Sequence, residues 1–315
     1  MTSTTSLSTN RWYSMSTRLD YIPGSSIVPP DVFTISPSSL GKFFDEPHTW
    51  YREHVLGERS FDQTTSTCLG TIVHFCGEDF ILSGQVDRTE IYRYLYSVVC
   101  PTNSPEFPSS EPEMLAVLQS YKHVSIDIQH ILNQYRPMGN ALLDYIRKLP
   151  KHAPLVSEQM VAAEVIPGFY IAGSCDLRQG SNLYDFKTTS ALSAPSSISY
   201  GYRLQLLAYA YAFIKSGTPI STASIIWVTT NQVNRISPDT GKPMRDYPAT
   251  CSVSKSIIID EQSLEFIESI LKLVAETVQF VLANPDKAYI TFRDYRLKLS
   301  EIPQIQFLRT PNVSS

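Results

Sequence analysis

An acidic residue followed two positions later by a lysine occurs once in the chain, at Asp185-Phe186-Lys187, and a second carboxylate, Asp176, stands nine residues before Asp185. Two carboxylates can hold Mg²⁺, which keeps several waters as its other ligands. The ion polarises a phosphoryl oxygen, and a lysine beside it can offset negative charge in the transition state. The spacing therefore favours hydrolysis of a phosphodiester. The plainer alternative is a surface salt bridge between Asp185 and Lys187.

Two short β-strands are predicted to position these residues, one at 169–177 and one at 183–188. Side chains alternate between the two faces of a strand, so Asp185 and Lys187 point the same way. The residues that alternate with them along the strand point into the core. If the two strands are neighbours in a sheet, Asp176 converges on the same spot. The local pattern thus predicts one compact acidic site with a lysine in it.

Two predicted helices carry candidate site residues spaced i, i+4, which places both members of each pair on one helix face. Gly70 and His74 form the first pair: the glycine permits close backbone approach, and the histidine can donate a hydrogen bond or bind a metal. A histidine on an apolar helix is more often a core residue. Gln205 and Tyr209 form the second pair, for which a chance position at the helix rim is an equal alternative.

A further carboxylate is available on the strand predicted at 156–165. Glu158 opens this strand and is a candidate third acid, Glu164 competes for the role, and the alternative for each is a solvated strand residue. The strand turns at Pro167-Gly168 into the strand that carries Asp176. Sequence alone leaves the choice between the two glutamates open.

The remaining pattern predicts a mixed α/β fold, with a central mixed β-sheet flanked by helices and a helical N-terminal half. Ser36 is a candidate cap and Pro37 a candidate first helical residue. Residues 87–150 are mostly helical by pattern, and 233–236 is expected to pair with 250–259 as an arm. Asp260 is expected to cap the last helix.

Composition and charge narrow the class of protein. Hydrophobic residues make up 43% and charged residues 18% of the chain, as in ordinary globular proteins. A net charge of −4 argues against nucleic-acid binding by bulk charge and leaves a local basic groove open. Five scattered cysteines favour reduced thiols and a cytoplasmic location, and no zinc spacing is present. No apolar run is long enough for a membrane span.

These residues occur in the order of a known family's motifs. The set resembles the RecB-type branch of the PD-(D/E)XK nuclease superfamily, which includes relatives of lambda exonuclease and RecE. The resemblance covers about residues 35–230. It is carried by Ile35-Ser-Pro-Ser-Ser-Leu40 leading to Glu46-Pro47 and Trp50-Tyr51, and by Gly70-x-x-x-His74, Glu158, Gly173-x-x-Asp176, Asp185-x-Lys187-Thr188 and Gln205-x-x-x-Tyr209.

The resemblance implies a restriction-endonuclease-like core and a Mg²⁺- or Mn²⁺-dependent DNA nuclease, more often an exonuclease, in recombination or DNA processing. His74, Asp176, Asp185 and the carbonyl of Phe186 would bind the metal, and Lys187 would be the catalytic lysine. The remaining implied site residues are Glu158 at the edge of the metal site and Gln205 and Tyr209 beside the scissile strand.

Departures from the family pattern limit what is carried over. The cysteine near Glu46-Pro47 and the C-terminal cysteine cluster of some relatives are absent, so no iron–sulfur cluster is expected. DNA is the expected partner, and a recombination partner protein and a homo-oligomer stay open. The alternative function is a nuclease-fold DNA-binding protein with weak or no catalysis. The expected organisation is a flexible arm (1–30), one nuclease domain (31–300) with a helical insertion at about 84–150, and a tail (301–315).

Overall fold

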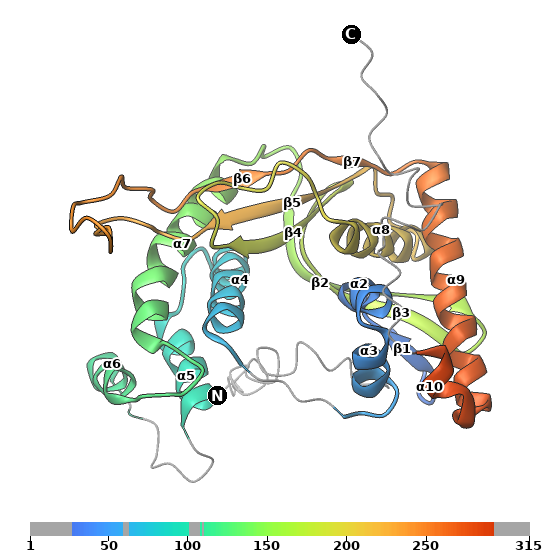
Figure 1. The fold of residues 1–315 in the computed structure, drawn as a ribbon. Coiled ribbons are helices and arrows are strands. Elements are labelled where there is room, and N and C mark those ends of the chain that lie inside the picture. Colours follow the sequence, from blue (N-terminus) through green and yellow to red (C-terminus); the bar gives the residue numbers. More distant parts are fainter. Residues whose placement is uncertain (1–26, 59–62, 101–107, 109, 293–315) are drawn as a thin grey trace, which may run out of the picture.

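The structure is a computed structural model that describes residues 27–58, 63–100, 108 and 110–292. Residues 1–26 of the predicted N-terminal arm and the whole predicted tail, 301–315, lie outside these ranges. Within them, the chain builds a mixed β-sheet with helices on both faces, which confirms the predicted fold class (Figure 1).

The described strands form one seven-stranded sheet in the order β1-β3-β4-β5-β6, with β2 also paired to β3 and β7 to β5. Two pairs are parallel, β1 with β3 and β4 with β5, and the others are antiparallel. The strands are β1 (Phe33–Ile35), β2 (Leu155–Ile166), β3 (Phe169–Gln179), β4 (Asn182–Thr189), β5 (Thr222–Thr229), β6 (Cys251–Val253) and β7 (Ile257–Ile258).

Helices gather in two groups, with the sheet between them (Figure 1). One group is α4 to α7, and the other is α2, α3, α8, α9 and α10. None of the described helices combines the length and the apolar character that a membrane crossing needs. The bounds are η1 (Pro37–Ser39), α2 (Leu40–Asp45), α3 (Pro47–His54), α4 (Thr65–Ser83), α5 (Arg88–Val99), α6 (Glu111–Ser120), α7 (Ile128–Lys148), α8 (Tyr200–Lys215), α9 (Glu261–Ala283), η2 (Pro285–Lys287) and α10 (Ala288–Thr291).

Each face of the sheet has its own apolar core. Residues of α8, α9 and the N-terminal helices pack on the face that carries Leu183 and Ile225. Residues of α4 to α7 pack on the opposite face, against Phe186, Ile226 and Val228. Burial on both faces explains why β5 is a continuous apolar run rather than an alternating one.

Helix starts follow the sequence signals closely. Asp260 caps α9 in a capping box with Ser263, as predicted, and Thr64 does the same for α4 with Thr67. Pro37 is the first residue of η1, also as predicted, but the Ser36 side chain caps no backbone N–H group. Its hydroxyl lies 3.1 Å from that of Ser38 instead.

The predicted pairing of 233–236 with 250–259 is wrong. Within 250–259, β6 and β7 instead pair with the free edge of β5. Because β5 is buried, backbone groups left unpaired along this edge would be costly. Residues 230–250 form an arm that closes on itself through isolated bridges, Gln232 with Tyr247 and Ile236 with Pro243. The side chain of Gln134 on α7 holds the base of this arm by two hydrogen bonds to the backbone of Asn231.

Candidate active site

The sheet divides beside β3, and the candidate site lies at the division. One edge of β3 pairs with β2 along nearly its whole length. On the other edge, β1 pairs with residues 169–171 and β4 with residues 177–179. Residues 172–176 have no strand partner on that edge within the described part of the chain, and Asp176 is the last of them.

Two side chains satisfy backbone groups that the division leaves without ladder partners. The N–H of Phe186 on β4 donates to Asp176 Oδ2 at 2.6 Å. The hydroxyl of Tyr209 on α8 donates to the carbonyl of Ser174 on β3, also at 2.6 Å. Because unpaired buried backbone groups are costly, Asp176 stabilises the separated arrangement of β3 and β4, and Tyr209 ties the unpaired part of β3 to α8. A side chain at Gly173 would meet Tyr209, with its Cβ 3.3 Å from the hydroxyl.

Asp185 is at the centre of the predicted constellation. The Lys187 ammonium group is 2.5 Å from Asp185 Oδ2, and the Gln205 amide donates to Asp185 Oδ1 at 2.7 Å. Asp185 is only 4% exposed and Gln205 only 6%, so the alternative of a surface salt bridge is wrong. Asp185 and Lys187 thus share one face of β4 as the strand alternation predicts, and Gln205 of α8 meets them there.

His74 on α4 reaches the site from the other face of the sheet. Its Nδ1 lies 3.4 Å from Asp176 Oδ2, and its ring packs edge-on against Phe186 with centroids 5.7 Å apart. Close backbone approach falls at Gly77 rather than at the predicted Gly70. A Cβ at Gly77 would lie 2.8 Å from the Phe186 ring, whereas one at Gly70 would be in ordinary contact with its neighbour.

Glu158 lies beside the site, and Glu164 does not. The β2–β3 register pairs Ser157 with Leu177 and Gln159 with Cys175, so Glu158 stands opposite Asp176. Its backbone has a φ of 49°, in the left-handed region that a glutamate rarely adopts. The Ser174 hydroxyl donates to Glu158 Oε2 at 2.7 Å. Glu164 instead accepts the N–H of Gly168 at the hairpin turn.

The two aspartates have different electrostatic surroundings. Burial disfavours the ionised form of Asp176, but His74 and Lys187 outweigh burial and lower its pKa to about 2. For Asp185 burial dominates over the attraction of Lys187, and its pKa is raised. The pKa of Lys187 is raised, because Asp185 and Asp176 together overcome the effect of burial. Both carboxylates therefore act on one ammonium group.

The side chains fit a metal that needs few protein ligands. Among the described residues, no three His, Cys, Asp or Glu side chains are grouped so as to hold a metal ion. Asp176 and Asp185 are two carboxylates on neighbouring strands that share Lys187 as a partner. Mg²⁺ is commonly held by one or two carboxylates with waters completing its shell, and this donor set suits that chemistry.

A pocket of about 690 Å³ adjoins the site between α2 and the start of α8. Gln205 and Tyr202 line it on the α8 side, and Lys42 and Asp45 line it on the α2 side. Burial, assisted by neighbouring Glu46, raises the pKa of Asp45. Lys42 is paired with Glu53 at 2.6 Å. The pocket is therefore lined by aromatic and charged side chains next to the buried Asp185–Gln205 pair.

Comparison with known proteins identifies the family. The sequence profile of the PD-(D/E)XK nuclease superfamily matches residues 34–312. The chain belongs to this superfamily, and the match extends past residue 230, beyond the segment that carries the motif resemblance. Membership supports a nuclease function, which is the hydrolysis of phosphodiester bonds in nucleic acid. A search of curated proteins gives no match.

The chain is distantly similar to two solved structures. One, "Crystal structure of SSO0001", is 14% identical with a TM-score of 0.36, covering 85% of this chain and 83% of that one. Another, described as a "Putative exonuclease" from Eubacterium rectale, is 10% identical with a TM-score of 0.39, covering 91% and 87%. These TM-scores are low, so no feature of either structure is transferred to this chain.

Two site contacts were missed by the sequence reasoning. Ser174 links Glu158 to Tyr209, since its hydroxyl donates to the first and its carbonyl accepts from the second. The centre of the Tyr202 ring lies 5.2 Å from Nζ of Lys187. Tyr202 precedes Gln205 by three residues, so the i, i+3 spacing on α8 is the signal that could have found it.

Proposed function

We propose that the chain is a Mg²⁺- or Mn²⁺-dependent DNA nuclease of the RecB-type, lambda-exonuclease-like branch, and that it acts as an exonuclease in DNA recombination or processing. One observation carries the proposal. Asp176 from β3 and Asp185 and Lys187 from β4 come together where those strands separate, and Gln205 of α8 binds the buried carboxylate.

The carboxylates of Asp176 and Asp185 would hold the metal, with His74 and the carbonyl of Phe186 as the further proposed ligands. The three side chains are not grouped as a ready-made metal cluster, so metal binding would draw them together. A bound divalent cation supplies Lewis-acid polarisation of the scissile phosphate and acidifies water. The contact between His74 and Asp176 supports the assignment of both to one centre.

The chain's own residues have separate tasks. Lys187 presents a protonated amine, because the two carboxylates raise its pKa, and it can donate to a phosphate oxygen or to the attacking water. Gln205 occupies Oδ1 of Asp185 and so fixes the plane of that carboxylate. Tyr209 holds Ser174, two residues before Asp176, and thereby fixes the direction of β3 at the site. Glu158 lies beside Ser174 at the edge of the centre.

The wider organisation belongs to the same proposal. Residues 31–300 form one nuclease domain, with α5 to α7 as its helical insertion. This domain acts on DNA in the cytoplasm. A homo-oligomer and a recombination partner protein are compatible with it. The arm at 230–250 presents Lys242 and Arg245 at exposed positions, which suits a few local phosphate contacts in a chain of net charge −4.

A cleavage assay tests the proposal. Linear duplex DNA labelled at one end is incubated with the protein and Mg²⁺, Mn²⁺ or EDTA, beside a covalently closed circle of the same sequence. Release of mononucleotides or short products from the linear DNA only, and only with metal, is expected. Cutting of the circle would replace the exonuclease with an endonuclease. DNA binding without cleavage under all conditions would favour the alternative, a nuclease-fold binding protein.

A further inference from the structure

The ammonium group of Lys187 contacts an aromatic ring as well as a carboxylate. Its Nζ lies 2.5 Å from Asp185 Oδ2 and 5.2 Å from the centre of the Tyr202 ring. The Lys187 side chain is 20% exposed, so most of its surface is covered by protein rather than water. A cation within about 6 Å of a ring centre is attracted by the negative face of the ring.

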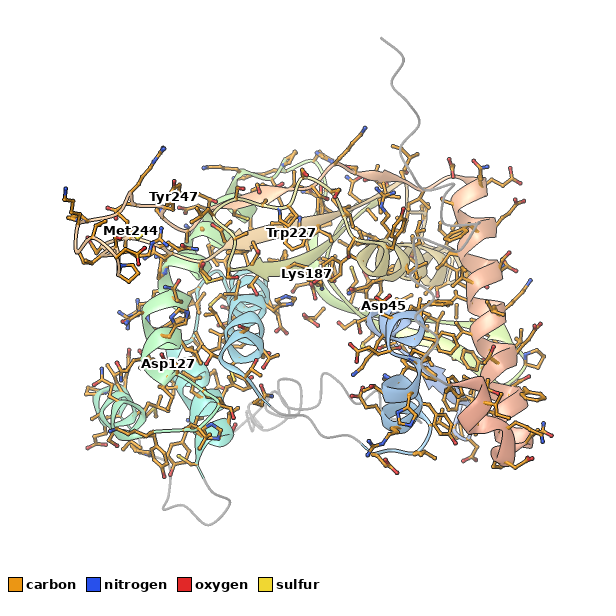
Figure 2. All side chains as sticks on the ribbon, in the orientation of Figure 1. Asp45, Asp127, Lys187, Trp227, Met244 and Tyr247 are labelled. Carbon is orange, nitrogen blue, oxygen red and sulfur yellow. The ribbon has the colours of Figure 1, made fainter. Side chains whose placement is uncertain are left out.

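Tyr202 is restrained at its backbone and at its ring. Tyr202 is in the first turn of α8, and its N–H donates to the side chain of the helix cap, Ser199, at 3.4 Å. The ring also packs on Trp227, with centroids 5.8 Å apart and planes at 68°. Trp227 is 5% exposed and is paired in register with Lys187 on the neighbouring strand. Figure 2 shows Lys187 and Trp227 close together on the sheet.

The Tyr202 ring adds a second restraint to the Lys187 side chain, beside its contact with Asp185. Lysine has a flexible four-carbon stem and a compact charge without directional preference. Gln205 fixes the carboxylate of Asp185, but an ammonium group can pivot around one carboxylate oxygen. A rigid ring at a second point removes that freedom, and the packing on Trp227 keeps the ring itself from turning away.

We propose that Tyr202 is a positioning residue for Lys187, whose ring face holds the ammonium group where it acts on the scissile phosphate. This inference rests on the proposed nuclease function and adds to it a residue outside the family motifs. The attraction is electronic, so a residue of equal size with a weaker ring quadrupole should perform the task less well. A role in packing alone would not depend on the electrons of the ring.

The experiment replaces Tyr202 by phenylalanine, by leucine, and by phenylalanines with one, two and three ring fluorines, with linear duplex DNA and Mg²⁺ as the probe. Tyr202→Phe should keep kcat within about threefold, whereas Tyr202→Leu should lower it by roughly 5- to 30-fold. Each added fluorine should lower kcat further, while KM and the Mg²⁺ concentration at half-maximal rate stay constant. A flat fluorine series, or a change confined to KM, would overturn the proposal.

The same helix supplies a matched control. Tyr211 also has a lysine over its ring, with Lys215 Nζ at 5.2 Å from the ring centre. Lys215 faces Glu268 on α9 rather than the site. The fluorine series at position 211 should therefore leave kcat unchanged. A parallel decline at positions 202 and 211 would assign the effect to packing of α8 and would also overturn the proposal.

A readout that does not need cleavage separates this inference from the proposed function. In protein labelled with ¹³C-lysine, the Cε protons of Lys187 should be shifted upfield by the ring, in the wild type and in Tyr202→Phe but not in Tyr202→Leu. An unshifted Lys187 in the wild type would overturn the contact itself. Absence of any metal-dependent cleavage by the wild type would instead overturn the nuclease function.

Discussion

The two edges of β4 differ in how completely they are paired. Towards β5, all eight residues are in register, 182–189 with 222–229. Towards β3, only residues 182–184 are paired, with 177–179. The continuous edge has a complete backbone ladder, and seven of the eight β5 residues along it are buried. At the interrupted edge, the backbone binds side chains, and these are the residues that the family motifs name.

The difference shows how one strand can serve stability and chemistry together. A complete ladder leaves no backbone group available and no room for a carboxylate between strands. Separation after Tyr184 brings the side chain of Asp176 to the N–H of Phe186, one residue from Asp185. The site is therefore built at the place where pairing stops. Substitutions at the two edges should have different consequences, which the following experiments measure.

The largest effect is expected from the carboxylates at the interrupted edge. Asp176→Asn and Asp185→Asn should each reduce metal-dependent cleavage by at least about 10³-fold, since a metal contributes several kcal/mol to the transition state. The fold should persist, because the amide oxygen of asparagine can still accept from the Phe186 N–H at position 176 and from Gln205 at position 185. Single-turnover cleavage and circular dichroism check this. Near-wild-type rates in either variant with Mg²⁺ would remove that residue from the site.

Lys187→Ala should come next, with a loss of roughly 10²–10⁴-fold, the usual range for a group that moves a proton or offsets charge. Metal affinity should be largely kept, because lysine is not a ligand. Titration calorimetry with Mn²⁺, run beside the cleavage assay, separates the two quantities. Loss of metal binding together with activity would make Lys187 a structural residue.

Gln205→Ala should lower cleavage by about 10- to 100-fold, because a hydrogen bond to a buried charged group contributes roughly 1.5–3 kcal/mol. The matched variant at the continuous edge is Thr222→Val, which removes a 2.7 Å hydrogen bond between Thr222 and Asn182. It should lower the free energy of unfolding by about 1 kcal/mol and leave cleavage unchanged. Equal effects of both variants on rate would erase the distinction between the two edges.

The smallest effect concerns the pH dependence of stability in metal-free protein. The pKa of His74 is raised because Asp176 attracts the proton, which outweighs burial. Stability from this pair is complete between the unfolded pKa of aspartate, about 3.9, and that of histidine, about 6.5, and is lost as pH rises through the higher folded value of His74. It is also lost at low pH, as Asp176 protonates near its pKa of about 2.

His74→Ala should therefore destabilise the protein more at pH 5.5 than at pH 9, by on the order of 1 kcal/mol. Thermal unfolding in EDTA at the two pH values measures the difference. Equal destabilisation at both pH values would show that His74 acts only as a packing residue. Partial rescue of cleavage in this variant by high Mn²⁺ would support the separate role as a ligand.

Local patterns in the sequence predicted most of the elements that carry the site. Strand alternation places Asp185 and Lys187 on one face of their strand, and helix periodicity places Gln205 and Tyr209 on one face of their helix. These properties depend on residues near one another in the chain. The capping residue Asp260 and the strands around Asp176 were predicted for the same reason.

Long-range pairing could not be obtained in this way. The partner of 250–259 is β5 rather than 233–236, a choice decided by the buried edge of a strand that the local sequence does not describe. The need for Gly77 arises from the ring of Phe186, more than one hundred positions away. Tyr202 was overlooked because its meaning depends on Trp227 and Lys187, which only the folded sheet brings to it.

The positive φ of Glu158 strains the backbone at this position. Asp31 and Asn234 also have positive φ, but aspartate and asparagine adopt this conformation at lower cost than glutamate does. Glycine at position 158 would relieve strain of about 1 kcal/mol or more and would delete a carboxylate beside Ser174. Directed evolution for heat resistance alone should therefore enrich glycine there, whereas evolution for turnover should retain the acid. The residue recovered at position 158 would report which of the two pressures a population had experienced.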